Sequence, residues 1–206
     1  MERIILGSGS PRRHEILELA CVKHEIIVPK ADESAVPYTG DCARYVGSLA
    51  KLKSDALSEI LEKRDENEFD VITICADTVV FSPKYPQPLG KPKDKADAVR
   101  MLTMLSGTKH YVMTGVCLKN CVKINGKFTT ERQVSFAETT EVRFRDVTSD
   151  EIEAYVDREP PLDKAGAYGI QDSACSFVSG ITGDFYNVVG LPICRIMEEI
   201  KKMSAK

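Results

Sequence analysis

A continuous run of apolar and β-branched residues, Val71-Ile72-Thr73-Ile74-Cys75, constrains the fold more than any other feature of the chain. Such a run suits a central β-strand that is covered on both faces. Near the start of the chain, a short apolar strand at residues 4–6 precedes Gly7-Ser8-Gly9-Ser10, and Pro11 fits the first turn of a helix. Strands and helices therefore alternate, and the chain is expected to have an α/β fold.

Helical periodicity predicts two helices in the first third of the chain. The first carries Ile16, Leu17 and Leu19, and the second repeats apolar residues from position 45 to position 60. Lys53 falls on the polar face of that second helix. Residues 25–28, between the two helices, have the composition of a strand.

Capping and turn residues predict the remaining elements. Asp94 should cap a helix that ends at Ser106-Gly107, Thr148 with Glu151 forms a capping box, and residues 188–203 suit a C-terminal helix. Alternating strands at residues 110–118 and 139–144 should be joined through an Asn125-Gly126 hairpin turn. Helix and hairpin signals together predict a mixed sheet.

Length and composition indicate one soluble globular domain over residues 1–206. The formal net charge is −3, which excludes a global basic field for nucleic acid or an anionic membrane, so we expect neither as a partner. We see neither a signal-peptide core nor a membrane span, and the chain contains 7 cysteines, an odd number at scattered positions. We therefore expect a cytoplasmic protein with reduced, mostly buried thiols, and we favour a hairpin with two thiols over a zinc site at Cys117 and Cys121.

The loop between the first strand and the first helix is a candidate anion site. Gly7, Ser8, Gly9 and Ser10 offer backbone amides and hydroxyls beside a helix N-terminus, and Arg12-Arg13 add guanidinium groups that match phosphate oxygens. The alternative is a solvated helix start with two surface arginines. The P-loop and Gly-x-Ser-x-Gly patterns are both absent, and the three histidines fit structural or surface roles.

A carboxylate, Asp77, follows the central apolar run, and we expect it at the C-terminal end of that strand, where α/β folds place ligand contacts. It could hold a divalent cation or take a proton from water, or it could simply cap a turn. Asp32 and Glu33 are weaker candidates for cation ligands. Lys53 and Lys91 could neutralise phosphate charge, although lysines are more commonly solvated surface charges.

Several motifs, read in chain order, resemble the Maf family of nucleotide pyrophosphatases. They cover nearly the whole chain: Leu6-Gly7-Ser8-Gly9-Ser10-Pro11-Arg12-Arg13, Ala76-Asp77-Thr78-Val79-Val80, Gly90-Lys91-Pro92, Ser106-Gly107-Thr108, Asp163-Lys164-Ala165-Gly166-Ala167-Tyr168-Gly169-Ile170-Gln171 and Asn187-Val188-Val189-Gly190-Leu191-Pro192. The resemblance implies a mixed, bent β-sheet flanked by helices, with a deep cleft between two lobes, related to the inosine triphosphatases. It also implies hydrolysis of a nucleoside triphosphate to the monophosphate and pyrophosphate with Mg²⁺ or Mn²⁺.

The same resemblance implies roles for individual residues. Asp77 matches the family's proposed proton acceptor, and Arg13, Thr78 and Gln171 match positions associated with substrate choice. Glu33, Lys53 and Lys91 fit the phosphate and metal end, with Glu33 and Asp77 as metal ligands. The remaining substrate contacts are expected from Ser8, Ser10 and Arg12, although the division of roles between Arg12 and Arg13 is open.

The segment ending in Gly169-Ile170-Gln171 resembles the branch of the family that prefers dTTP and UTP, and the family implies a homodimer. Two alternatives stay open: the same chemistry on methylated or damaged purine nucleotides, and a non-catalytic nucleotide-binding regulator of cell division. The chain departs from the common pattern at Gly7, where alanine is usual, in a lengthened charged segment at residues 62–68, and in an extended hairpin between Val116 and Glu138.

Overall fold

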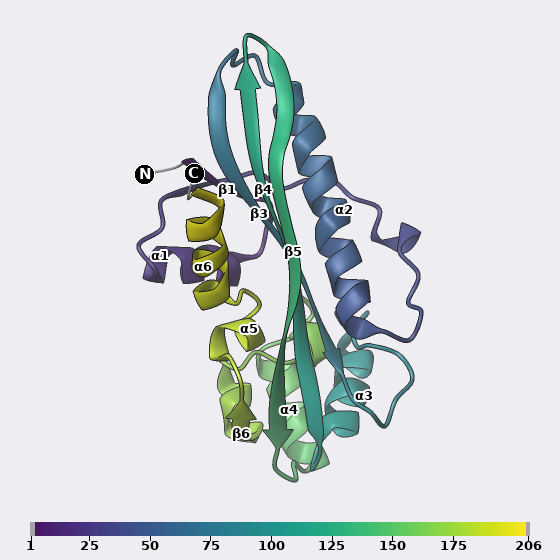
Figure 1. The fold of residues 1–206 in the computed structure, drawn as a ribbon. Coiled ribbons are helices and arrows are strands. Elements are labelled where there is room, and N and C mark those ends of the chain that lie inside the picture. Colours follow the sequence, from purple (N-terminus) through teal and green to yellow (C-terminus); the bar gives the residue numbers. More distant parts are fainter. Residues whose placement is uncertain (1–2, 205–206) are drawn as a thin grey trace.

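The computed structural model describes residues 3–204, and three long strands run through most of the length of the molecule (Figure 1). In chain order the elements are β1 (Arg3–Leu6), α1 (Pro11–Leu19), β2 (His24–Ile26), η1 (Glu33–Ala35), α2 (Cys42–Glu62), β3 (Phe69–Phe81), α3 (Lys95–Leu105), β4 (Lys109–Ile124), β5 (Lys127–Phe144), α4 (Ser149–Arg158), η2 (Ala165–Ala167), η3 (Ser173–Phe177), β6 (Val178–Thr182), α5 (Phe185–Val189) and α6 (Ile193–Ser204).

Within residues 3–204 these strands form a six-stranded sheet in the order β2-β1-β3-β4-β5-β6. Strand β1 pairs in parallel with β2 and β3, whereas β3, β4, β5 and β6 pair antiparallel in succession. The expected mixed α/β sheet is therefore confirmed. The turn between β4 and β5 is the expected one, since Asn125 and Gly126 both have positive φ angles, 51° and 77°.

The apolar run forms part of β3, but this strand continues well beyond it. Leu6, the last residue of β1, pairs with Ile74, and β3 extends alongside β4 to Phe81. Asp77 consequently lies within β3 and not at its end, which corrects the sequence-based expectation. The reason is that the antiparallel partner β4 keeps the backbone of β3 hydrogen-bonded after its parallel partner has ended.

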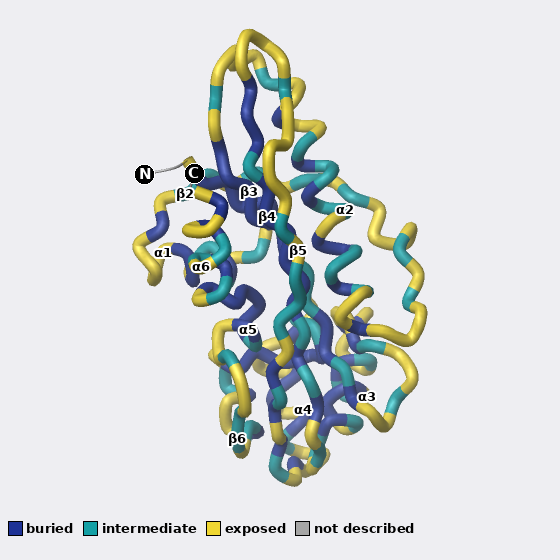
Figure 2. Tube along the Cα trace, in the orientation of Figure 1, coloured by how far each residue is buried: buried dark blue, intermediate teal, exposed yellow. Residues whose placement is uncertain are grey.

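Helices cover both faces of the sheet (Figure 1). Helix α2 covers one face, and beneath it lies a small core that includes Ile5, Leu57, Leu61 and Cys75. The larger core continues on the opposite face and into the end of the molecule that holds α3, α4 and β6, which we call the second lobe. The part with β1, β2 and α1 is the first lobe. Figure 2 shows buried chain running through the centre of the molecule, with exposed chain at the hairpin tip and in the outer loops.

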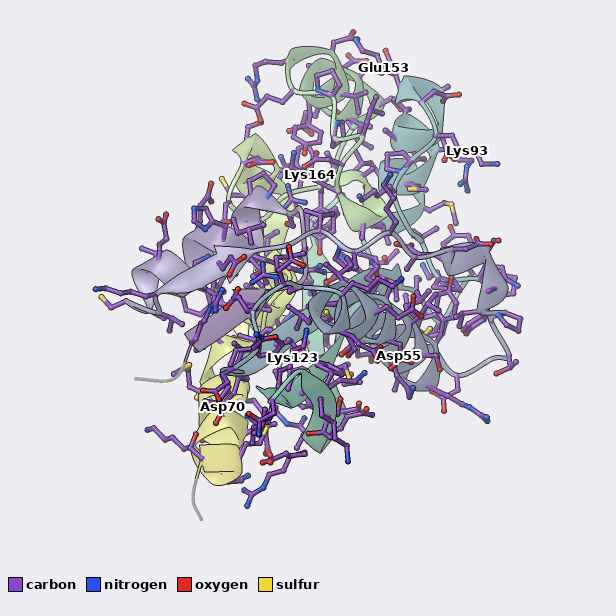
Figure 3. All side chains as sticks on the ribbon, turned by 90° about the horizontal axis from the view of Figure 1, so that it is seen from above. Asp55, Asp70, Lys93, Lys123, Glu153 and Lys164 are labelled. Atoms are coloured by element: carbon purple, nitrogen blue, oxygen red, sulfur yellow. The ribbon has the colours of Figure 1, made fainter. Side chains whose placement is uncertain are left out.

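Two lysines of β4 hold α2 in place. Lys119 Nζ lies 2.6 Å from Asp55 Oδ1, and Lys123 Nζ donates to the carbonyl oxygens of Glu62 and Arg64 at 2.9 and 2.6 Å. A cation beside the last carbonyls of a helix satisfies acceptors that have no partner within the helix. Asp55 and Lys123 are labelled in Figure 3. The extended hairpin thus helps to fix the helix that carries Lys53.

Two helix faces and one helix boundary differ from the sequence-based expectation. The buried stripe of α2 includes Val46, Leu49, Ala50, Ser54 and Leu57, which places Lys53 at the edge of that stripe and not on the solvated face. The error arises because the apolar spacing from position 45 to position 60 fits two adjacent stripes about equally well.

Leu19 at the end of α1 is 68% exposed and outside the core. The C-terminal helix is broken into α5 and α6, because Gly190 adopts a φ of 122° that a helix does not accommodate. The expected caps of α3 by Asp94 and of α4 by the Thr148–Glu151 capping box are confirmed.

The cysteines are free thiols, with Cys42, Cys75, Cys117 and Cys121 buried and Cys21, Cys175 and Cys194 exposed. Within residues 3–204, no group of three or more His, Cys, Asp or Glu side chains could hold a metal ion. A search of the same described residues finds no helix long and apolar enough to cross a membrane.

Candidate active site

A cavity of about 590 Å³ opens where β1 ends beside β3, and it is lined from both lobes of the molecule. Most of the site residues predicted from the sequence line it: Ser8, Ser10, Arg12, Arg13, Glu33, Lys53, Asp77, Thr78, Lys91 and Gln171. Asp32 is outside this lining, because its side chain caps η1 and accepts hydrogen bonds from the amide and hydroxyl of Ser34. Tyr45, Val112 and Tyr168 add apolar wall. The structure therefore brings together side chains that come from distant parts of the chain.

Lys53 lies between two carboxylates in this cavity. Its Nζ atom is 2.5 Å from Asp77 Oδ1 and 2.9 Å from Glu33 Oε1. The side chains of Lys53 and Asp77 are only 18% and 13% exposed, so water screens this pair far less than a surface ion pair. Burial raises the pKa of the neighbouring Tyr45 phenol, and the charges of Asp77 and Glu33 raise it further.

Arg13 is buried and engaged by acceptors of the protein itself. Its Nε donates to the Gly190 carbonyl at 2.9 Å, one terminal nitrogen donates to Ser8 Oγ and the Ala76 carbonyl at 3.1 and 2.7 Å, and the other donates to Thr78 Oγ1 at 3.1 Å. These contacts use four of the five N–H donors of a guanidinium group. Burial lowers the pKa of Arg13, and the Asp77 charge opposes this effect. Arg13 therefore joins the loop of residues 7–10, which we call the anion loop, to β3 and to the α5–α6 junction.

Arg12, the adjacent arginine, faces the opposite wall. It donates to Asp163 Oδ2 at 2.6 Å and to the Asp163 carbonyl at 3.2 Å, and both side chains are partly exposed. This difference in burial separates the two arginines, which the sequence left open: Arg13 is built into the floor, and Arg12 lies at the rim.

The anion loop offers a different set of amides from the one expected. The Gly7 amide donates to the Ile74 carbonyl at 2.8 Å, and the Ser10 amide donates to Ser8 Oγ at 3.2 Å. Ser10 is the N-cap of α1, but its side chain makes no capping hydrogen bond. Amides available to an anion are therefore those of Ser8, Gly9 and the first turn of α1 rather than the whole Gly7–Ser10 set.

Gln171 and Lys91 complete the cavity from the second lobe. Both residues are exposed, and neither side chain makes a hydrogen bond to any of residues 3–204. The loop of Lys91 is held in place because the Gly90 carbonyl accepts a hydrogen bond from the Gly166 amide at 3.0 Å. The two side chains are thus free to contact a ligand.

Glu33 and Asp77 are the carboxylates that could hold a divalent cation. Both touch the same Lys53 amine, so their oxygens converge on one point of the cavity. Mg²⁺ is commonly bound by one or two carboxylates together with substrate phosphates and waters. The residues present fit such an ion, with the substrate supplying the other ligands.

Residues 3–203 match the family described as Maf-like protein. The chain belongs to this family. The relatives of this Maf-like protein include a dTTP/UTP pyrophosphatase of Bacillus anthracis (strain CDC 684 / NRRL 3495), which is 45% identical over 204 residues, 99% of this chain and 97% of the relative. Another, a dTTP/UTP pyrophosphatase of Bacillus cytotoxicus, is 43% identical over 205 residues, 100% of this chain and 97% of the relative.

Among solved structures, the Ham1 protein of Staphylococcus aureus aligns with a TM-score of 0.45 at 16% identity, covering 97% of this chain and 100% of that one. A HAM1 protein of Coxiella burnetii aligns with a TM-score of 0.44 at 11% identity, covering 98% of this chain and all of the other. Both TM-scores are below 0.5, so the fold assignment rests on the strand order and pairing described above.

Sequence reasoning missed the charged residues opposite Arg12 in this Maf-like protein. Lys164 lines the cavity, and its Nζ lies 3.0 Å from Asp163 Oδ1 and 3.1 Å from Asp172 Oδ2. Burial raises the pKa of Asp163, but hydrogen bonds from Arg12 and Lys164 outweigh it and lower that pKa to about 2. The signal was present, since Asp163 and Lys164 open the motif that ends in Gln171, but only the contact with Arg12 ties them to the anion loop.

The structure explains why position 7 is glycine, where the Maf family usually has alanine. A Cβ atom at this position would lie 2.3 Å from Cys75 Sγ and 2.9 Å from Leu57 Cδ2. The thiol of Cys75 therefore fills the space that the alanine methyl would need. Glycine at position 7 and cysteine at position 75 are mutually compatible, and no altered anion chemistry is required to explain the difference.

Proposed function

We propose that this Maf-like protein is a nucleoside triphosphate pyrophosphatase that hydrolyses dTTP and UTP to the monophosphate and pyrophosphate. The observation that carries the proposal is the Glu33–Lys53–Asp77 cluster, which faces the arginine-bearing anion loop across one cavity. The names of relatives that are 43–45% identical over nearly the whole chain support the same substrate class.

In the proposed reaction, Asp77 orients a water molecule and accepts its proton while the water oxygen attacks the α-phosphorus. The bond from the α-phosphorus to the bridging oxygen breaks, and pyrophosphate leaves. Oδ1 of Asp77 is held by Lys53, so Oδ2 is the oxygen that takes the proton. A carboxylate that lines the cavity and is only 13% exposed suits this role, because it can position the attacking water before reaction.

The cations of the cavity stabilise negative charge on the triphosphate. Arg12, Lys53 and Lys91 line the cavity near the amides of the anion loop. Preorganised donors of this kind act most strongly on charge that develops in the transition state, and removal of one typically costs about 10² to 10³ in rate. Arg13 supports them by holding the loop.

The proposed cofactor is Mg²⁺ or Mn²⁺, held by Glu33 and Asp77. When bound there, the ion supplies charge neutralisation and orientation of the phosphate oxygens. Equilibrium dialysis of the protein with Mn²⁺ in the presence of an α,β-methylene analogue of UTP, which is not hydrolysed, before and after Glu33→Gln, tests this assignment without measuring turnover. Equal Mn²⁺ retention by both proteins would remove Glu33 from the ligand set.

Gln171 is the proposed reader of the base. Its side-chain amide carries both a donor and an acceptor, which complement the imide edge of uracil or thymine. A hydrogen-bonding pocket rejects bases with the wrong pattern far better than an apolar pocket does. Thr78, bonded to Arg13, is proposed to support substrate choice from the floor of the cavity.

Purified protein incubated with Mg²⁺ and a panel of nucleoside triphosphates tests the function. We expect pyrophosphate release to be fastest with dTTP or UTP. Preference for a methylated purine triphosphate would favour the alternative substrate class, and no release from any nucleotide would leave only the non-catalytic regulator.

A cytoplasmic location and a homodimer are further parts of this proposal. Size-exclusion chromatography with light scattering measures the oligomeric state directly. Fractionation of cells that express the tagged protein tests the location.

A further inference from the structure

Four charged side chains of alternating sign form a row beside the cavity, and we call them the charge chain: Arg12, Asp163, Lys164 and Asp172. The first three line the cavity. Arg12 pairs with Asp163 at 2.6 Å, and Lys164 Nζ contacts Asp163 at 3.0 Å and Asp172 at 3.1 Å. The charge chain begins in the first turn of α1 and ends one residue after Gln171. Figure 3 labels Lys164 between the purple N-terminal ribbon and the green segments of the second lobe.

Lys164 is the most sheltered member of the charge chain. Its side chain is 15% exposed, whereas those of Asp172 and Asp163 are 29% and 56% exposed. An ion pair contributes more when both of its members are shielded from water, so the Lys164–Asp172 pair is the stronger of the two contacts of this amine. The Lys164–Asp172 pair is therefore the better-shielded link of the charge chain.

The absence of a side chain at Gly169 leaves room for the Lys164–Asp172 pair of the charge chain. A Cβ atom at Gly169 would lie 2.3 Å from Asp172 Oδ2 and 3.0 Å from Lys164 Cε. The Asp172 amide also donates to the Gly169 carbonyl at 3.1 Å, which closes a tight turn over residues 169–172. Gln171 is the third residue of this turn. The Lys164–Asp172 pair therefore packs directly against the backbone that carries Gln171.

The start of the loop is anchored independently of the charge chain. Gly166 and Ala167 have left-handed φ angles of 67° and 63°, and Tyr168 donates or accepts a hydrogen bond with buried His110 at 2.8 Å. The turn at residues 169–172 follows this anchor. Of the described side chains, Lys164 is the one whose ion pairs join that turn to Asp163 and so to Arg12.

We propose that Lys164 is a positioning residue for base recognition. Through Asp172 it orients the turn that presents Gln171, and through Asp163 it sets the distance from that turn to Arg12 at the phosphate end. The spacing between the base and the triphosphate is thereby matched to a pyrimidine nucleotide. The inference rests on the proposed function and adds a residue that does not itself touch the base.

Lys164→Met tests the inference, because it removes the charge and keeps most of the side-chain length. We expect the ratio of kcat/KM for UTP to kcat/KM for GTP to fall by at least about 10-fold, since small misplacements of a recognition group are costly. Lys164→Arg should keep the ratio within about threefold, since a guanidinium can also bridge the two carboxylates. Lys93→Met, outside the cavity, is the matched control.

Inorganic tripolyphosphate, which has no base, separates positioning from phosphate binding. Its inhibition constant against UTP hydrolysis should change by less than about threefold in Lys164→Met, whereas a direct phosphate ligand would lose roughly 10-fold or more. Asp172→Asn should lower the UTP preference similarly, and the double variant should add little to either single change.

An unchanged UTP-to-GTP ratio in a folded Lys164→Met protein would overturn the inference, as would an equal loss for UTP, GTP and tripolyphosphate. Failure of the proposed function is distinguishable, because it would be seen in the wild-type protein as no pyrophosphate release. The inference depends on that function and would fall with it.

Discussion

At the scale of single residues, the two adjacent arginines show how burial assigns different roles to the same side chain. Arg13 satisfies the Ala76 and Gly190 carbonyls inside the protein, whereas Arg12 pairs with a half-exposed carboxylate at the rim. Removing a donor from buried acceptors costs the desolvation of those acceptors. Removing one member of an exposed ion pair costs little.

The difference in burial between Arg13 and Arg12 predicts different effects of the same substitution at the two positions. Arg13→Met should lower the free energy of unfolding by about 2–4 kcal/mol, because several buried acceptors lose their partner. Arg12→Met should change it by less than about 1 kcal/mol but raise KM for UTP. Urea unfolding and steady-state kinetics of both variants measure the two effects, and equal stability losses would contradict the assignment.

The proton transfer in the proposed reaction depends on Asp77. Asp77→Asn keeps the shape and the contact with Lys53 but cannot accept a proton, so turnover should fall by at least about 10²-fold. Pyrophosphate release measures the loss, and circular dichroism checks that the fold is intact. Near-normal turnover would remove Asp77 from the mechanism.

At the scale of elements, the anion loop and β3 are fitted to each other through Gly7 and Cys75. The overlap of a Cβ atom with Cys75 Sγ at 2.3 Å means that one of the two residues must be small. The same strand carries Asp77 two residues later. A change in this packing is therefore expected to reach the active site.

Gly7→Ala should destabilise the protein by about 1–3 kcal/mol, the usual cost of overpacking a filled core. In a Cys75→Ala background the same change should cost less, because the Sγ atom that it meets is absent. A double-mutant cycle from urea unfolding measures the coupling. Additive losses would show that the contact with Leu57, and not with the thiol, sets the cost.

At the scale of the whole molecule, the long strands make the two lobes parts of one sheet (Figure 1). The cavity lies where β1 ends beside these strands. The core of the second lobe includes His110, which is fully buried and packs against the rings of Phe144 and Tyr168. Burial lowers the pKa of His110 to about 4, from 6.5. A neutral histidine inside this core links folding to pH.

Stability should therefore fall as the pH drops from about 6.5 to about 4, because over that range the unfolded chain binds a proton that the folded protein excludes. The loss between pH 7 and pH 5 should be about 2 kcal/mol from this group. His110→Phe should remove most of it, whereas His14→Phe, on α1 outside the core, should not. Urea unfolding at the two pH values measures both, and an unchanged dependence in His110→Phe would exclude His110 as its source.

The expectation of one domain over residues 1–206 stays a prediction, and thermal unfolding tests it. If the shared sheet couples the lobes, calorimetry should show one transition with equal calorimetric and van't Hoff enthalpies. Two separable transitions would divide the chain at the cavity.

Local signals of the sequence sufficed for most of the elements. Each of these signals acts over a few residues and agrees with the final fold: the apolar run, the Asp94 cap, the Thr148–Glu151 box and the Asn125-Gly126 turn. The residues of the candidate site could also be predicted, because the motifs contain the residue types that phosphate binding requires. These parts of the protein were determined by the sequence itself.

Only the tertiary structure decided how those residues are used. Arg13 and Gly190 are 177 positions apart, and Arg12 and Asp163 are 151 apart, so no local pattern reveals which arginine is buried. The place of Asp77 within β3 depends on pairing with β4, and the direction of Lys53 depends on which stripe of α2 packs on the sheet. Contacts across the fold set burial, and burial sets which charges are structural and which face the substrate.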